Sequence, residues 1–252
     1  MKQLIESKVV TDKKIDLDRV KIRTDGVANH SHDCRGCSAG KAHRTRFGDH
    51  LNSRLRAPAS HPLARVTADL AGPYPTESIG GARYLLVIYD EYTEMGFVDF
   101  LAHKSDATKA IIKWCRQART RHNRNVVTFH TDGGGEFIND ELTKYFTSRG
   151  TTHTHTTPHT SQHNGKAERL IRTLNEWSNA ALIHCGAPKA FWSHAIDTVM
   201  YTRNLTHLCA NDASNSDAPR TAFARWFGVT TPTPIDHLRV FGCDADVTHV
   251  TG

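Results

Sequence analysis

The order of the apolar segments along the chain constrains its fold more than any other feature of the sequence. Short apolar or alternating segments typical of strands occur at 65–70, 84–89, 96–101 and 126–131. Apolar residues at a 3.6-residue period favour helices at 105–118, 140–148, 161–181 and 188–199. This order predicts an α/β sandwich, with helices packed on a sheet, rather than a barrel or a helical bundle.

Single residues mark the expected starts of two helices, and one helix has a long apolar face. Ser105 is a suitable N-cap for the first helix, and Pro188 suits the first turn of the last one. The longest helix places the following residues on one face: Ala167, Leu170, Ile171, Leu174, Trp177, Ser178 and Ala181. We expect this face to be buried.

The composition is that of a globular protein. Of the 252 residues, 38% are hydrophobic and 23% are charged, and the mean hydropathy is −0.50. The longest aliphatic run, Leu85 to Ile88, is far shorter than the ~18 residues that a membrane-spanning helix needs. The first residues lack the apolar segment of a signal peptide. We therefore expect no membrane association and a reducing intracellular compartment.

The net charge is concentrated near the N-terminus. Residues 1–60 hold 13 Lys and Arg against 7 Asp and Glu, whereas the remaining residues hold 19 of each. A basic arm on a neutral body suits phosphates, although many such arms are only solvated surface. Two prolines make 57–62 a linker, so we expect a domain boundary there.

Three acidic residues stand where chemistry is plausible. Asp69 lies inside the first expected strand, Asp132 ends the fourth strand before three glycines, and Glu168 borders the apolar face of the longest helix. Carboxylates that converge repel one another, and divalent cations relieve that repulsion. Mg²⁺ and Mn²⁺ prefer oxygen ligands, and two such ions suit phosphodiester chemistry. Acidic residues at this spacing also occur by chance, so the residues around them carry the argument.

Those flanking residues carry a resemblance to a known family. The motifs are Thr67-Ala68-Asp69-Leu70-Ala71-Gly72-Pro73, Thr131-Asp132-Gly133-Gly134-Gly135-Glu136-Phe137 and Pro158-His159-Thr160-Ser161-Gln162-His163-Asn164-Gly165-Lys166-Ala167-Glu168-Arg169. Two further motifs are Cys34-Arg35-Gly36-Cys37 and His237-Leu238-Arg239-Val240-Phe241-Gly242-Cys243. Over almost its whole length the chain resembles the integrases of copia-type retrotransposons. Gly133 and His163 depart from the residues frequent at those positions in the family.

The resemblance implies a fold and a division into domains. The fold is RNase H-like, a mixed five-stranded sheet flanked by helices, with a small partial zinc-binding region at the N-terminus. The implied domains are the end of a zinc-binding region (1–56), a linker (57–62), the integrase catalytic core (63–208) and the start of a C-terminal region (209–252).

The resemblance also implies an activity. Asp69, Asp132 and Glu168 match the family's catalytic residues, which bind two Mg²⁺ or Mn²⁺ ions. A 3′-hydroxyl of element cDNA attacks a phosphodiester of target DNA, without a covalent enzyme intermediate. The implied partners are double-stranded DNA and further copies of the chain. The implied location is the nucleus, after a stage in cytoplasmic virus-like particles.

Cys34 and Cys37 have the spacing of half a zinc site, because Zn²⁺ takes four ligands. In the family the two histidine ligands lie about thirty residues upstream of the cysteines, which here falls at or before Met1. We therefore expect zinc binding only in a longer chain. Two unligated thiols are the alternative.

Basic and polar residues near Glu168 are candidates for DNA contacts. Lys166, Arg169 and Arg172 suit phosphates, and Gln162 and Asn164 suit bases or sugar edges. His159 is expected to contact DNA or the scissile region. The alternative for the basic residues is a solvated helix face with an internal Glu168–Arg172 pair. A second basic run is expected to be surface rather than site: Lys113, Arg116, Arg119, Arg121 and Arg124.

Other functions remain open at this stage. The chain could be a different RNase H-like nuclease that hydrolyses DNA, an inactive or domesticated DNA-binding module, or a non-functional fragment. Four further acidic residues are expected to be structural or solvent-facing: Asp90, Glu91, Asp99 and Glu136.

Overall fold

The computed structural model of the chain describes residues 10–11, 58–155, 165–209 and 220–244. The region 1–56, with Cys34 and Cys37, lies outside the described residues except for β1 (Val10–Thr11), which pairs in parallel with β7 (Thr233–Pro234). The domain boundaries and the zinc site therefore stay predictions.

A mixed sheet of five strands forms the centre of the fold. Its strands are β2 (Arg65–Ala71), β3 (Tyr84–Asp90), β4 (Gly96–Leu101), β5 (Thr128–Thr131) and β6 (Thr152–His155). The spatial order is β4-β3-β2-β5-β6. Strand β3 is antiparallel to both of its neighbours, whereas β2, β5 and β6 run parallel. The expected mixed five-stranded sheet is confirmed.

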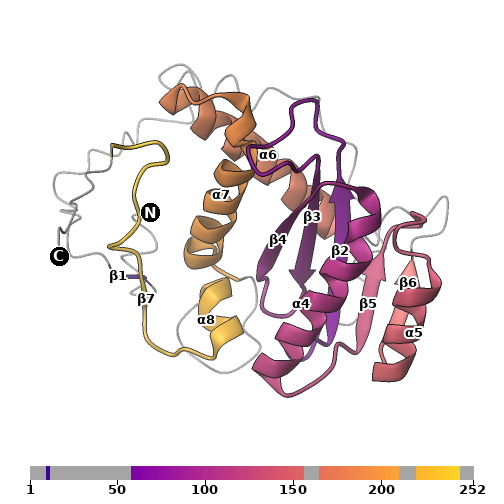
Figure 1. The fold of residues 1–252 in the computed structure, drawn as a ribbon. Helices are drawn as coiled ribbons and strands as arrows, with labels where there is room; N and C mark the ends of the chain where they lie inside the picture. Colours follow the sequence, from indigo (N-terminus) through magenta and orange to yellow (C-terminus); the bar gives the residue numbers. More distant parts are fainter. Residues whose placement is uncertain (1–9, 12–57, 156–164, 210–219, 245–252) are drawn as a thin grey trace, which may run out of the picture.

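Helices cover both faces of this sheet (Figure 1). They are α4 (Ala107–His122), α5 (Asp140–Arg149), α6 (Gly165–Cys185), α7 (Trp192–Thr206) and α8 (Ala222–Phe227), with short 3₁₀ turns η2 (Lys104–Asp106) and η4 (Lys189–Phe191). The core on one face joins the sheet to α4, α5 and α8, and the core on the other face joins it to α6 and α7.

Side-chain alternation along β3 shows why this strand is apolar throughout. Leu86 and Ile88 belong to the core under α4, whereas Leu85 and Val87 belong to the core under α6 and α7. A strand buried on both faces needs a continuous apolar run, which is the pattern that the sequence has at 84–89.

Two sequence predictions about the helices are wrong in detail. Ser105 does not cap α4, because it lies inside η2 and the N-cap position of α4 is Asp106. Trp177 was expected on the buried face of α6 but is 43% exposed. The buried residues of α6 form a narrower stripe: Ala167, Leu170, Leu174, Ser178 and Leu182. Trp177 precedes Ser178 and therefore lies about 100° around the helix from it.

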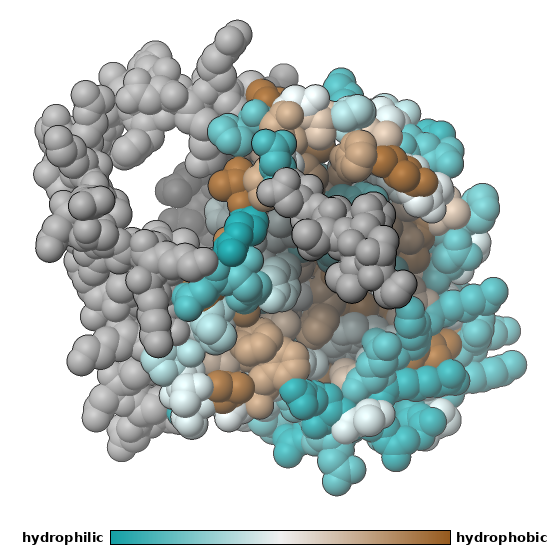
Figure 2. All heavy atoms as spheres, turned by 60° about the vertical axis from the view of Figure 1, so that its left-hand side comes forward, coloured by the Kyte–Doolittle hydropathy of each residue, from teal (hydrophilic) through white to brown (hydrophobic). Residues whose placement is uncertain are grey.

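The surface is mixed in character. Figure 2 shows separate hydrophobic patches and a shaded hollow near the middle, with hydrophilic residues predominating at the lower right of the described surface. Among the described residues, no helix combines the length and the apolar character that crossing a membrane requires.

Candidate active site

The strand pairing of β2 with β5 brings two of the predicted acidic residues together. The parallel register pairs Arg65 with Thr128 and Thr67 with His130. Counting on in the same register places Asp69 opposite Asp132, which directly follows β5. Because carboxyl ends of parallel strands meet at one edge of a sheet, two aspartates 63 positions apart in the sequence become neighbours.

Both aspartates lie on the face of the sheet that α6 covers. Val66 and Ala68 belong to the core under α4, so Asp69 points to the opposite face, where Ala71 packs against the core that includes Leu174 of α6. Glu168 lies in the first turn of α6, where it is exposed beside the buried Ala167. The helix therefore delivers the third carboxylate to this face.

The electrostatics of Asp69 show that the predicted acids act on one another. The pKa of Asp69 is raised to about 7, and burial is the largest cause of the rise. The negative charges of Asp132, Glu168 and Glu136 contribute to the same rise, while a hydrogen bond of 2.9 Å from the Leu70 N–H opposes it. All four carboxylates thus belong to one electrostatic cluster, in which a divalent cation would relieve the repulsion.

The turn after β5 fixes the position of Asp132. Its Oδ1 accepts a hydrogen bond of 3.0 Å from the Gly134 N–H. A side chain at position 134 would have its Cβ 2.8 Å from the carboxyl group of Glu136, so glycine lets Glu136 fold over the turn. Glu136 forms an ion pair of 3.5 Å with Lys104. Glu136, predicted to be structural or solvent-facing, also adds its charge to the site, because the turn brings it there.

The three side chains fit a hard divalent cation, since they offer only carboxylate oxygens. The carboxylate of Asp69 is also repelled by its negatively charged neighbours. Among the described residues, no three His, Cys, Asp or Glu side chains are gathered closely enough to hold an ion as they stand. The carboxylates are therefore neighbours across one face rather than a closed cage. A metal site at Asp69, Asp132 and Glu168 stays a prediction.

Only part of the predicted DNA-contact set lies in the described residues. Lys166, Arg169 and Arg172 are exposed on α6, whereas His159, Gln162 and Asn164 lie outside the described residues. Lys166 forms an ion pair of 3.2 Å with Glu91. Among the ion pairs of the described residues, none joins Glu168 to Arg172, the pair that belonged to the alternative interpretation of this helix face.

The segment that follows β2 is tied to α6 and α7. Tyr74 donates a hydrogen bond of 2.7 Å to Asn175 of α6 and stacks on Trp192 of α7, with ring centroids 4.2 Å apart. Trp192 donates a hydrogen bond of 3.0 Å to the carbonyl of Thr76. These contacts hold the end of the Asp69 strand and the Glu168 helix in one unit. They join residues about a hundred positions apart, which helical periodicity cannot reveal.

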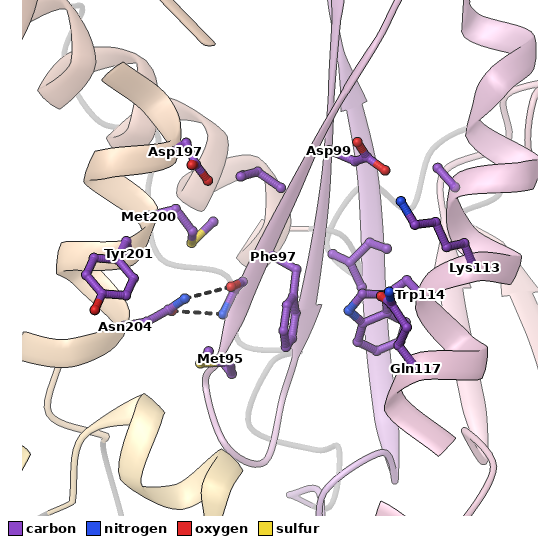
Figure 3. Close-up of a pocket in the computed structure, with 14 residues that line it drawn as sticks. Met95, Phe97, Asp99, Lys113, Trp114, Gln117, Asp197, Met200, Tyr201 and Asn204 are labelled. Carbon is purple, nitrogen blue, oxygen red and sulfur yellow. Dashed lines mark hydrogen bonds between the residues drawn. The ribbon is translucent and has the colours of Figure 1, made fainter. Parts of the chain in front are cut away.

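A separate hollow of about 350 Å³ lies at the outer edge of β4, between α4 and α7 (Figure 3). Its apolar lining includes Phe97, Trp114 and Met200. Asn204 closes part of the free strand edge, because its side-chain amide donates to the Gly96 carbonyl at 2.7 Å and accepts from the Gly96 N–H at 3.1 Å. This hollow contains none of the predicted site residues.

Replacing Asp69 by Asn is expected to stabilise the metal-free protein at pH 8. In the unfolded chain Asp69 loses its proton near its ordinary pKa of 3.8, whereas in the folded chain it keeps the proton up to about pH 7. Folding stability therefore falls as the pH rises between these values. We expect Asp69→Asn to raise the free energy of unfolding by on the order of 2 kcal/mol at pH 8 and by much less at pH 5.

Urea unfolding in EDTA at both pH values measures this difference. The exposed Asp140, at the start of α5, provides the matched substitution Asp140→Asn, for which we expect a small effect. A gain for Asp69→Asn that is equal at pH 5 and pH 8 would refute the assignment of the raised pKa to Asp69.

Comparisons with known proteins show which proteins the chain is related to. No protein-family model matches the chain. The chain is 31% identical over 214 residues to the retrovirus-related Pol polyprotein from transposon TNT 1-94 of Nicotiana tabacum, which covers 84% of the chain and 15% of the polyprotein. It is 30% identical over 220 residues to the corresponding polyprotein from transposon RE1 of Arabidopsis thaliana, covering 86% of the chain and 14% of that protein.

The fold is similar to that of a solved intasome chain. A chain of the cryo-EM structure of the simian T-cell lymphotropic virus intasome in complex with PP2A regulatory subunit B56 gamma matches with a TM-score of 0.52 and 15% identity, over 84% of this chain and 66% of that one. The HTLV-2 integrase catalytic core domain in complex with magnesium, in its trimeric form, has a TM-score of 0.48 and 17% identity, over 66% of this chain and 97% of that one.

The matched region is a small part of each relative, since the chain spans about 15% of the length of the curated polyproteins. Its fold is similar to that of the retroviral intasome chain. The chain belongs to the Pol polyproteins of copia-type retrotransposons, and its described part has the RNase H-like fold of an integrase catalytic core.

Proposed function

We propose that the chain is the catalytic region of a retrotransposon integrase, which joins the 3′ ends of element cDNA to target DNA. One observation carries this proposal. The register of β2 with β5, and the packing of α6 on the same face, bring Asp69, Asp132 and Glu168 into one electrostatic cluster. The mutual repulsion of three acids from distant parts of the sequence costs stability in the metal-free protein.

In this proposal Asp69, Asp132 and Glu168 hold divalent cations, with Mg²⁺ or Mn²⁺ as the ions that suit oxygen ligands. Such ions, when bound, activate the attacking oxygen and stabilise the leaving oxygen of a phosphodiester. The chain's contribution is to fix the carboxylates. Asp69 is held by its strand and the Leu70 N–H, and Asp132 by the Gly134 N–H.

The proposed reaction is a single displacement at phosphorus. The 3′-hydroxyl oxygen of the cDNA forms a bond to a target phosphorus, and the bond from that phosphorus to the target's 3′ oxygen breaks. The attacking hydroxyl loses its proton to solvent, and the leaving 3′ oxygen of the target strand takes up a proton from solvent to become a 3′-hydroxyl. One phosphodiester forms as one is lost, so the balance needs neither an external energy source nor a covalent enzyme intermediate.

Exposed cations beside Glu168 are proposed to position the DNA backbone. Lys166, Arg169 and Arg172 lie on the first two turns of α6 and are exposed. Phosphate contacts of this kind fix the register of the nucleic acid without reading its sequence. The ion pair between Lys166 and Glu91 would open as Lys166 takes up a phosphate.

A joining assay tests the proposal against its alternatives. A labelled duplex with a free 3′-hydroxyl is incubated with supercoiled plasmid and Mg²⁺, and the products are separated by size. Label transferred to the plasmid supports integrase activity. Cutting without transfer favours an RNase H-like nuclease, and duplex binding without any metal-dependent product favours an inactive DNA-binding module.

We further propose that the active form is a multimer that works in the nucleus.

A further inference from the structure

A basic cleft lies away from the carboxylates, between the last turns of α4 and α5. We define the basic cleft by the residues that line it: Arg116, Arg119, Thr120, Asn123, Tyr145 and Arg149. Its volume is about 410 Å³. Arg116 and Arg119 belong to the second basic run of the sequence, which was predicted to be surface rather than site. The structure places these two arginines in one cleft with Tyr145.

Helical spacing explains why these side chains converge. On α4 the lining residues Arg116, Arg119, Thr120 and Asn123 follow the i, i+3, i+4, i+7 pattern of a single helix face. On α5 Tyr145 and Arg149 are four residues apart, which again places them on one face. Two helix faces that meet in this way place Arg116, Arg119 and Arg149 around one cleft.

Tyr145 holds two of the arginines in place. The guanidinium carbons of Arg116 and Arg149 lie 5.9 and 5.7 Å from the centre of its ring, as cation–π contacts do. Arg149 also hydrogen-bonds the Tyr145 side chain. The guanidinium groups are therefore arranged before any ligand arrives, which lowers the entropy lost on binding.

The charges of the cleft are not neutralised within the described residues. Elsewhere among the described residues, Arg65, Lys104 and Lys166 form ion pairs with glutamates. None of the described ion pairs includes Arg116, Arg119 or Arg149, and α4 carries no acidic residue. The Nε of Arg149 is buried without a hydrogen-bond acceptor. Three cations and an orphaned donor in one cleft call for an anionic ligand.

The chemistry of the cleft suits phosphate groups on a backbone. Guanidinium groups donate two parallel hydrogen bonds to a phosphate, which makes arginine the preferred residue for such contacts. Arg116 and Arg119 are exposed, so the cleft opens to solvent and can accept a continuing polymer. The C-terminal ends of α4 and α5, which flank the cleft, lie low in Figure 1.

The location separates this cleft from the carboxylates. Helix α4 begins just after β4, at the end of the sheet where β2 and β5 also finish. Its 16 residues run back for ~24 Å toward the other end of the strands. Helix α4 also covers the face opposite to that of Asp69 and α6. A duplex lying against the carboxylates therefore does not reach the basic cleft along a straight path.

We propose that the basic cleft binds the phosphate backbone of a second segment of duplex DNA. The inference rests on the proposed function in one respect, namely that the nucleic acid is duplex DNA. It adds a binding site: the cleft retains a DNA segment that lies away from the reacting atoms, while another segment lies at the carboxylates. The contacts are to phosphates, so the site binds DNA irrespective of its sequence.

The test is the binding of a fluorescein-labelled 20-base-pair duplex of random sequence, measured by anisotropy in EDTA at several salt concentrations. The variant is Arg116→Gln with Arg119→Gln, which keeps the Tyr145–Arg149 contact. The matched control is Lys109→Gln with Lys144→Gln, which removes two exposed charges from the same helices outside the cleft. We expect about a tenfold loss of affinity for the variant and a salt slope reduced by about 2. The control is expected to change the affinity less than threefold.

Different results separate this inference from the proposed function. Equal losses for the variant and the control, in a protein that still joins DNA in the plasmid assay, would overturn the cleft and leave the proposed function standing. A loss of binding to a labelled poly-glutamate peptide, with duplex binding unchanged, would assign the cleft to an acidic protein and also overturn the inference. Circular dichroism of each variant shows that a loss of binding is not a loss of fold.

Discussion

Asp132→Asn is expected to lower the rate of DNA joining by at least about 10³-fold while the fold stays intact. In the proposed function the Asp132 carboxylate is a cation ligand, and the neutral amide removes its charge from the cluster around Asp69. A factor of 10³ corresponds to about 4 kcal/mol of transition-state stabilisation, a magnitude typical of metal-assisted displacement. The amide oxygen can still accept the hydrogen bond from the Gly134 N–H, so the turn is preserved.

The joining assay under single-turnover conditions measures this effect, with thermal unfolding as the check on folding. Asp140→Asn is the matched control, because Asp140 is exposed in the first turn of α5 and takes no part in the cluster around Asp69. A variant Asp132→Asn that joins DNA within tenfold of the wild-type rate would contradict the catalytic role of this carboxylate.

Asp90→Ala is expected to give the largest loss of stability, about 4 kcal/mol. The Asp90 carboxylate is fully buried and accepts three hydrogen bonds: from the Leu63 N–H at 2.8 Å, the Thr93 N–H at 2.8 Å and the Thr93 hydroxyl at 2.7 Å. Alanine leaves all three donors unpaired in the interior, and a buried donor without an acceptor costs about 1–3 kcal/mol. These bonds also fix the entry to β2 and the turn between β3 and β4.

Urea unfolding of Asp90→Ala tests this prediction against Asp99→Ala. Asp99 lies on the neighbouring strand, is half-buried and accepts one described hydrogen bond, from the Phe100 N–H at 2.9 Å. We expect the Asp99 substitution to cost less than about 1 kcal/mol. If the two substitutions cost the same, the buried hydrogen bonds of Asp90 do not contribute as the structure implies.

Local pattern predicted the elements of the fold well. Apolar periodicity gave α4 and the buried positions Ile111, Trp114 and Ala118 on it, because a helix that packs on a sheet needs such a stripe. The continuous apolar run at 84–89 gave β3 for the same reason. The motif around Glu168 also placed that residue on a helix, whose described part begins at Gly165.

Features that depend on tertiary packing could not be predicted from sequence patterns. Periodicity could not show that α6 buries a stripe too narrow to include Trp177, because the width of the contact depends on the sheet beneath. The pairing register of β2 with β5, which makes Asp69 and Asp132 neighbours, has no local signal. The basic cleft was missed because it needs Tyr145 and Arg149 from a second helix.

Isothermal titration calorimetry of Mn²⁺ binding tests whether the three carboxylates form one cation site. We expect Asp69→Asn, Asp132→Asn and Glu168→Gln each to weaken Mn²⁺ binding at least about tenfold, because each removes one carboxylate from a shared site. The control Asp140→Asn should bind Mn²⁺ as the wild-type protein does. Wild-type affinity for Mn²⁺ in any one of the three variants would contradict a site built from all three residues.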